Sequence, residues 1–173
     1  MPSPLLRLVL LGACASCASC AAEPAADIDE GALELAEDAC KPSGSSPLVI
    51  LGQGRGEYRD LQENEPVAVE AGPQGGHHVW LALRTFGLRQ AASVTVRGEF
   101  PGVGVDVPPD ESMVSLHLAE DGMCEIAGLR LQVDRTASLD VLVGEALDLE
   151  AEVTDETGDV GVATKRVVVA SAR

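Results

Sequence analysis

Residues 147–155 read LDLEAEVTD, so that apolar side chains at every second position alternate with acidic or hydroxyl-bearing ones. Successive side chains of a β-strand point to opposite faces of a sheet, and this alternation therefore predicts a strand with one face in a core and the other in water. The turn sequence Thr157-Gly158-Asp159 follows, and a further apolar run covers residues 160–170. Together the two runs predict an antiparallel hairpin.

The same period of two recurs through the chain back to residue 47. Strands are predicted at 48–51, 67–69, 79–83, 94–96, 103–105, 114–118, 129–133 and 139–143. Turn sequences rich in Gly, Pro and Asp separate these runs, and no segment has a helical period. Roughly eight to ten short strands in about 125 residues predict an all-β fold, an antiparallel β-sandwich. A small closed barrel satisfies the same alternation and is the alternative.

Composition narrows the choice of core and of partners. Apolar residues make up 46% of the 173 residues, but the aromatic ones are only Tyr58, Trp80, Phe86 and Phe100, so we expect an aliphatic core. Twelve Lys and Arg residues face 28 Asp and Glu residues, which gives a net charge of −16 at pH 7. A chain this acidic repels phosphate backbones, and nucleic acid is therefore not an expected partner.

The first thirteen residues predict export. They read MPSPLLRLVLLGA, with one cation, Arg7, beside a short apolar run. The run is too short to span a bilayer and is typical of a secretory signal peptide over residues 1–13. The sequence Leu11-Gly12-Ala13-Cys14 then resembles a bacterial lipobox, in which a branched residue and two small ones precede a cysteine. An ordinary secreted protein, cut near Ala21 or Ala22, is the alternative.

The lipobox resemblance implies cleavage before Cys14 and attachment of acyl chains, such as palmitate, to its thiol. Two or three acyl chains hold a protein stably on a membrane. In Gram-negative lipoproteins an Asp after the cysteine signals retention in the inner membrane. Ala15 stands there instead, which favours the outer membrane of a Gram-negative cell envelope.

Residues 14–46 are predicted to form a lipid-anchored acidic tether. Residues 23–38 hold seven acids and no base, and like charges disfavour a compact structure. The linker sequence PSGSSP over 42–47 closes this segment. The β-sandwich domain is therefore expected over residues 47–173.

Four cysteines remain if Cys14 carries lipid, and an even number in an oxidising compartment suggests disulfides. Three pairings are possible among Cys17, Cys20, Cys40 and Cys124. We favour Cys40–Cys124, because Cys40 lies at the entrance of the domain and Cys124 begins a strand. A zinc site at Cys17 and Cys20 is disfavoured, since a second half-site is lacking.

Two stretches resemble a known kind of domain. Residues 147–169 resemble the final hairpin of bacterial immunoglobulin-like domains, and GPQGGHHVW over 72–80 resembles a stretch in uncharacterised bacterial lipoproteins that carry such domains. The resemblance implies an immunoglobulin-like fold and an envelope location. It implies no activity.

Motifs for chemistry are weak. GQGRG over residues 52–56 follows a strand but precedes no helix, so a hairpin turn is predicted rather than a phosphate-binding loop. His77 and His78 are adjacent on a strand and should point to opposite faces. The acidic turn at 155–159 offers oxygen ligands for Ca²⁺, but without the spacing of a known loop. We predict no catalytic residue, no metal site and no cofactor.

Trp80 is the most informative side chain. If Val79 and its alternating neighbours face the core, Trp80 and His78 lie on the outer face of their strand and form a possible contact patch. A purely structural role for Trp80 is the alternative, and we favour it over the contact patch. The scarcity of aromatic residues weighs against carbohydrate binding, because sugar faces usually stack on several of them.

The sequence thus predicts a membrane-anchored envelope lipoprotein that displays a non-catalytic binding or structural module to an envelope protein or polymer. An accessory subunit of an envelope complex is one alternative. A metal-assisted envelope hydrolase is another, and it would need a pocket in which His77 or His78 meets two carboxylates.

Overall fold

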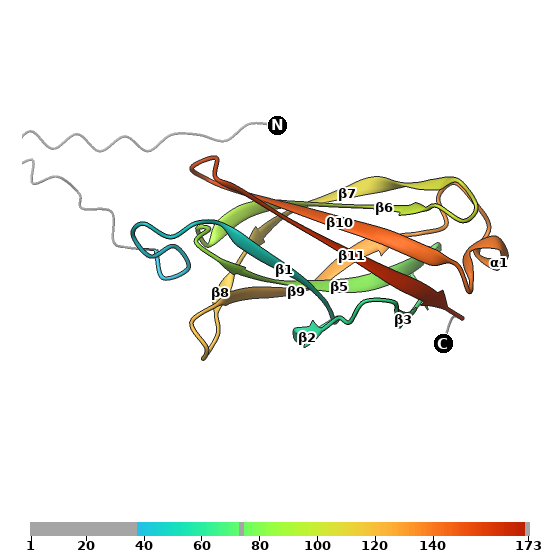
Figure 1. Ribbon diagram of the computed structural model, residues 1–173, viewed down its shortest axis with the longest axis horizontal. Coiled ribbons are helices and arrows are strands. Elements are labelled where there is room, and N and C mark those ends of the chain that lie inside the picture. Colours follow the sequence, from blue (N-terminus) through green and yellow to red (C-terminus); the bar gives the residue numbers. More distant parts are fainter. Residues whose placement is uncertain (1–37, 73–74, 172–173) are drawn as a thin grey trace, which may run out of the picture. The chain divides into compact units, whose positions relative to one another are not determined.

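The computed structural model describes residues 38–72 and 75–171, which form two β-sheets packed against each other (Figure 1). The all-β sandwich predicted from the alternation is therefore confirmed. The predicted signal peptide, the lipobox with Cys14, and Cys17 and Cys20 lie outside the described residues. The finer assignment to the immunoglobulin-like domains stays a prediction.

The first sheet consists of antiparallel strands in the order β2-β1-β5-β9-β8, with β4 paired to β5. Its strands are β1 (Leu48–Gln53), β2 (Arg59–Asp60), β4 (Glu70–Ala71), β5 (His77–Phe86), β8 (His117–Leu118) and β9 (Cys124–Gln132). The second sheet has the order β3-β11-β10-β6-β7, and only β3 and β11 pair in parallel. Its strands are β3 (Glu65–Ala68), β6 (Ala91–Phe100), β7 (Val105–Ser115), β10 (Ala146–Asp155) and β11 (Val160–Ala170).

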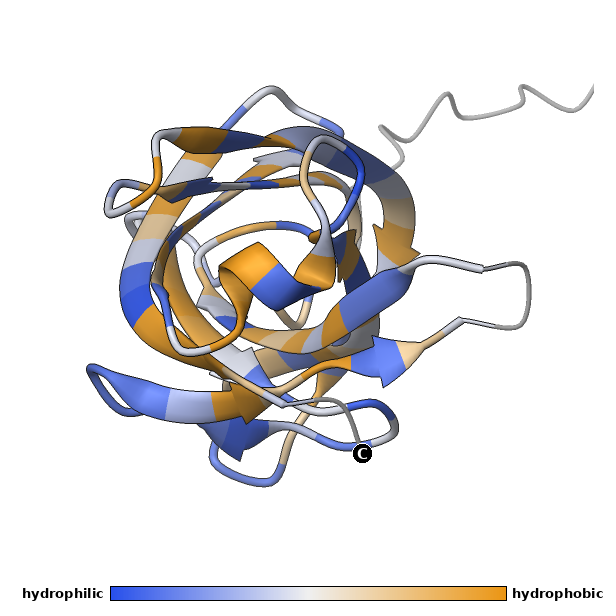
Figure 2. Ribbon diagram, turned by 90° about the vertical axis from the view of Figure 1, so that its right-hand side faces the viewer, coloured by the Kyte–Doolittle hydropathy of each residue, from blue (hydrophilic) through white to orange (hydrophobic). Residues whose placement is uncertain are grey.

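The core lies between the sheets and is aliphatic, as composition predicts. Leu147, Leu149, Ala151 and Val153 of β10 are all buried, whereas the residues between them are partly exposed. Figure 2 shows the corresponding alternation of hydrophobic and hydrophilic residues along the strands. Phe100 is the one fully buried aromatic side chain of the described residues.

The strand predicted at 139–143 is wrong. Residues Leu139–Leu142 form the short helix α1, which lies at one end of the sandwich (Figures 1 and 2). Leu142 is fully buried in the core, whereas Val141 is 49% exposed. Leu139 also packs against the core, because side chains three apart share one face of a helix.

The single strand predicted at 114–118 is also wrong. The chain leaves the second sheet at Ser115, passes through the fully buried Leu116, and joins the first sheet as β8. Leu116 bridges the two sheets, and its amide donates to the carbonyl of Gln90. Val103, predicted to lie in a strand, is part of the turn before β7.

Contacts with the sandwich begin before residue 47, the predicted start of the domain. Cys40 is buried, and its carbonyl accepts a hydrogen bond from the Gly87 amide. The Asp38 carboxylate accepts from the backbone amides of Cys40 and Gln90, both at 2.9 Å. The described residues from Asp38 onward therefore make contacts with the folded sandwich.

Candidate functional site

Trp80 lies on the outer face of β5, as the sequence predicts. Val79, Leu81 and Leu83 are fully buried on the opposite face, and the indole is half-buried. Its Nε1 donates to Glu70 Oε2 at 2.9 Å, and the Arg55 guanidinium lies over the ring, 5.0 Å from the centroid. A cation held over an aromatic face is attracted by the ring quadrupole. Neighbouring polar side chains therefore fix the indole in place.

The glycine-rich residues 52–56 carry Arg55 to this position. They form the predicted hairpin turn between β1 and β2, in which Gln53 pairs with Arg59. The Gly54 amide donates to the Trp80 carbonyl at 3.2 Å, and the Gly54 carbonyl accepts from the Gly128 amide at 3.0 Å. The turn therefore packs onto β5 and β9. The sequence predicted the turn itself but not this packing.

Gly52 has a steric role in the same arrangement. A Cβ atom at this position would lie 2.3 Å from the Tyr58 ring. Only glycine lets the ring approach the strand so closely. In the sequence, the three closely spaced glycines of residues 52–56 were the feature that indicated close packing of this segment.

Tyr58 adds a second aromatic ring to the outer face of the first sheet. The Arg84 guanidinium lies over the ring, 4.4 Å from the centroid, and also binds Glu125 and Asp121 at 3.1 Å. Burial and a hydrogen bond with Asp60 raise the pKa of Tyr58 to about 12. The phenol is therefore neutral at physiological pH. We call Arg55, Tyr58, Trp80 and Arg84 the aromatic–arginine surface.

A polar hollow of about 640 Å³ adjoins this surface. Arg130 of β9, which lines the hollow, pairs directly with Trp80 across the strands. Arg135 binds one oxygen of the Asp110 carboxylate, and the Gln132 backbone amide donates to the second oxygen at 3.1 Å. The hollow is further lined by Gly72, Gly75, Gly76, His78, Glu111, Ser112 and Gly128.

The two adjacent histidines diverge, as predicted. His77 Nδ1 lies 2.7 Å from Asp134 Oδ2, and the His77 amide donates to Asp134 Oδ1 at 2.9 Å. Burial raises the pKa of Asp134, but these hydrogen bonds and one from Gln132 outweigh it and lower that pKa to about 2. His78 instead faces the hollow beside Gly72.

The third histidine, His117, lies elsewhere in the first sheet, paired with Glu125. Within residues 38–72 and 75–171, no group of three or more His, Cys, Asp or Glu side chains could hold a metal ion. The histidines therefore do not converge on one site in the part of the chain that the structure describes.

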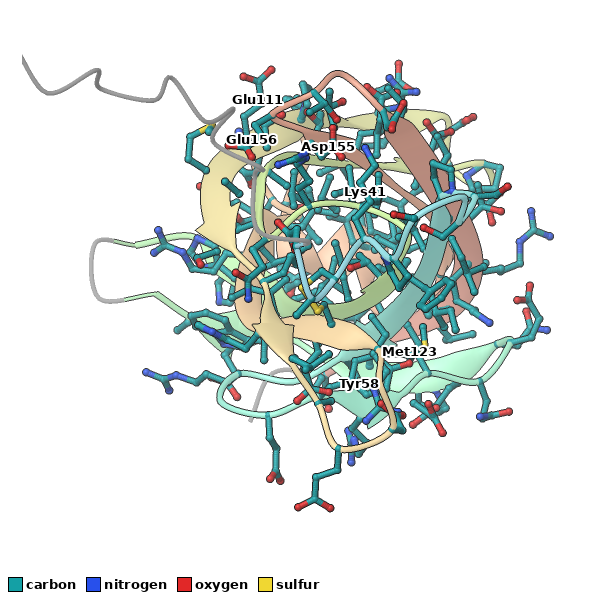
Figure 3. The ribbon with its side chains drawn as sticks, turned by 90° about the vertical axis from the view of Figure 1, so that its left-hand side faces the viewer. Lys41, Tyr58, Glu111, Met123, Asp155 and Glu156 are labelled. Carbon is teal, nitrogen blue, oxygen red and sulfur yellow. A yellow bond between two sulfur atoms is a disulfide. The ribbon has the colours of Figure 1, made fainter. Side chains whose placement is uncertain are left out.

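The entrance of the domain is held by a disulfide and an ion pair. Cys40 and Cys124 are bonded, with their Cα atoms 5.5 Å apart, which confirms the favoured pairing. Lys41 Nζ donates to Asp155 Oδ2 at 2.9 Å, and Figure 3 labels both residues. Lys41 Nζ also donates to Thr157 Oγ1 at 2.8 Å and binds Asp159.

The turn that offered calcium ligands is thus filled by the Lys41 ammonium. Asp155 is buried, which raises its pKa, but hydrogen bonds from Thr157, Lys41 and two backbone amides lower that pKa well below the ordinary range. Asp155 is therefore a buried carboxylate with a full set of partners.

No protein-family model matches the chain, and no curated protein matches it either. Among the residues that the structure describes, no helix is both long and apolar enough to cross a membrane.

Proposed function

We propose that this protein is an envelope lipoprotein, anchored by acyl chains on Cys14, that displays a non-catalytic binding module to an envelope protein or polymer. The observation that carries the binding role is the aromatic–arginine surface beside the hollow. Trp, Tyr and Arg are the residues that dominate binding energy at interfaces. Here two arginines each cover one outward-facing ring.

The position of the hollow supports display. The domain begins near the Cys40–Cys124 disulfide, and Cys124 pairs with Thr85 at one end of β5. His78 lies seven residues back along the same strand, which corresponds to about 23 Å at the usual rise of a β-strand. The hollow therefore lies far from the point at which the tether joins the domain.

A metal-assisted hydrolase is the second candidate, because His78, Asp110 and Glu111 all line the hollow. Within residues 38–72 and 75–171, however, they do not form a group that could hold a metal ion. However, Arg135 and the Gln132 amide already engage both oxygens of Asp110. A carboxylate so engaged is a poor general base or metal ligand, and the arrangement favours binding. A role as an accessory subunit would use the same surface.

The anchor is tested by intact mass and fractionation in a Gram-negative host, with Cys14→Ser beside wild type and Cys17→Ser as the matched control. We expect wild type and Cys17→Ser in the membrane fraction, without residues 1–13 and with the added mass of acyl chains. Cys14→Ser should be unacylated and should either leave the membrane fraction or stay unprocessed, with residues 1–13 still attached. A soluble, unacylated wild-type protein would contradict the anchor.

The binding role is tested with the full chain carrying Cys14→Ser, mixed with isolated envelopes of the source organism. We expect the protein to co-sediment and Trp80→Ala to lose most of this binding. Lys165→Gln, on β11 of the other sheet, is the control and should bind as before. Equal sedimentation of the Trp80→Ala and control proteins would argue against the surface.

A further inference from the structure

We infer that the hollow beside Trp80 binds a segment of an uncharged glycan. This inference rests on the proposed binding function and specifies its partner. The ligand would occupy the space between His78, Arg130 and Ser112, with one sugar ring near the indole. Four features of the hollow lead to this ligand class.

The first feature is the polarity of the lining. It combines donors, at Arg130 and the second hydrogen of the Gln132 side-chain amide, with acceptors at Glu111 and Ser112. Among the described residues that line it, there is no large apolar side chain. Binding pockets for lipids or drug-like molecules are mostly apolar, whereas a chain of hydroxyl groups needs donors and acceptors close together. The lining therefore suits a hydroxyl-rich ligand.

The second feature is the balance of charge. Arg130 and Arg135 face Asp110 and Glu111, so the lining carries two positive and two negative side chains. The chain as a whole has a net charge of −16. An anionic polymer would meet this repulsion without a net positive site to offset it, and a cation would meet two guanidinium groups. A neutral ligand avoids both costs.

The third feature is that binding groups are free or already oriented. The Arg130 side chain is exposed and has no hydrogen bond or ion pair with another residue of 38–72 or 75–171, so its guanidinium can donate to a ligand. Gln132 is fixed by hydrogen bonds with Asp134 and Arg135. A Cβ atom on Gly76 would lie 2.2 Å from the side-chain nitrogen of Gln132, so glycine lets the backbone at residue 76 pass directly against this side chain. Such preorganisation reduces the entropy lost on binding.

The fourth feature is the indole itself. Arg130 and Trp80 are cross-strand neighbours, with Cβ atoms about 5 Å apart in such pairs. The Arg55 side chain that covers the ring is 72% exposed, and its ion pair with Glu70 is loose, at 3.7 Å. An exposed cation–π contact is weak, so a sugar face could displace Arg55. The scarcity of aromatic residues argues against a sugar site built from several stacked rings. In this hollow, polar side chains would instead make most of the contacts with the sugar.

Trp80 is the only tryptophan of the chain, so its fluorescence reports on this site alone. The full chain carrying Cys14→Ser is titrated with the hexasaccharides of glucose and of N-acetylglucosamine, and with the acidic hexasaccharide of galacturonic acid. We expect a saturable change with at least one neutral hexasaccharide and none with the acidic one. Arg130→Gln should weaken the binding about tenfold, as expected for a lost hydrogen bond from a charged donor. Lys165→Gln should leave it unchanged.

No saturable change with either neutral hexasaccharide up to about 10 mM, beyond which binding is very weak, would overturn the inference. A response to the acidic hexasaccharide alone, or one that Arg130→Gln does not weaken, would also overturn it. If protease treatment of the envelopes abolishes Trp80-dependent sedimentation, the partner is a protein. These results would reject the glycan while leaving the proposed binding function in place, which only the sedimentation test can reject.

Discussion

Removing the Cys40–Cys124 disulfide should destabilise the domain by an amount that follows from the chain itself. The two cysteines are 84 residues apart in sequence. In the chain-entropy model, cross-linking a loop of this length removes about 15 cal/mol/K from the unfolded state, or about 4.6 kcal/mol at 25 °C. Domains of this size are stable by about 5–15 kcal/mol in total. The disulfide therefore supplies a large part of the stability.

The perturbation is the double variant Cys40→Ala with Cys124→Ala, in the full chain carrying Cys14→Ser. Unfolding in urea is followed by Trp80 fluorescence, which is unique in the chain. With a slope of about 2 kcal/mol per molar urea, the midpoint should fall by about 2 M. Both cysteines are buried, so the smaller alanines add a cavity cost to this value.

The parent protein in reducing agent is the control, because it loses the cross-link and keeps the side-chain volume. Reduction should lower its midpoint nearly as far, and it should not affect the double variant. A fall of less than about 1 kcal/mol in the reduced parent would refute the reasoning, because the cross-link would then restrict little of the unfolded chain. Free thiols at both positions in the untreated protein would refute it directly.

Three further outcomes are expected. Leu142→Ala should cost about 2–5 kcal/mol in urea unfolding and the exposed Val141→Ala less than about 0.5 kcal/mol, whereas equal costs would contradict the helix at this position. Gly52→Ala should lower the free energy of unfolding by about 1–3 kcal/mol and move Tyr58 into solvent, because the new Cβ displaces the ring. The tyrosine absorbance spectrum reports this exposure, and an unchanged spectrum would disprove the close contact. The folded-state pKa of Asp134 is lowered from 3.8 to about 2, so this carboxylate contributes about 2 kcal/mol to the free energy of unfolding above pH 5 and loses that contribution as the pH falls to 2. Asp134→Asn should therefore flatten this part of the curve of stability against pH, and an unaltered curve would count against the shift.

The alternation of apolar residues was sufficient to predict most strands, because burial of one sheet face imposes a period of two. It failed at 139–143, where Leu139, Val141 and Val143 alternate but the chain forms a helical turn. Over five residues the two periods are hard to distinguish, since Leu139 and Leu142 are also spaced as helical neighbours. The burial of Leu142, which breaks the alternation, separates them only once the structure is known.

The alternation also cannot show which sheet a residue joins. Val114, Leu116 and Leu118 fit one continuous strand, but the chain changes sheets at Leu116. Leu116 points into the core that both sheets share, so its burial is the same in either sheet. Strand partners depend on contacts far apart in sequence, which a local pattern does not contain.

The outward position of Trp80 followed from its neighbours, but its covering by Arg55 did not. That contact depends on a turn 25 residues earlier in the chain, and the glycines at 52–56 indicate only a close approach. The ion pair between Lys41 and Asp155 had no local signal, because the two residues are 114 positions apart. Because Lys41 follows the acidic residues 23–38, the sequence could have suggested that Lys41 pairs with a carboxylate, but it could not show which one.

The contacts at the start of the domain have a consequence for a tethered protein. Asp38, Cys40 and Lys41 are each bound to a part of the sandwich distant in sequence, and all three precede β1. A pull on the preceding chain would act first on the hydrogen bonds of Asp38 and then on the disulfide, which passes the load to Cys124 of β9 before it reaches Lys41 or the six residues by which β1 pairs with β5. Breaking a covalent bond requires far more energy than separating a strand. The attachment thus protects β1, which carries the turn with Arg55, and so keeps the aromatic–arginine surface intact under load, as the proposed display of this surface from a membrane requires.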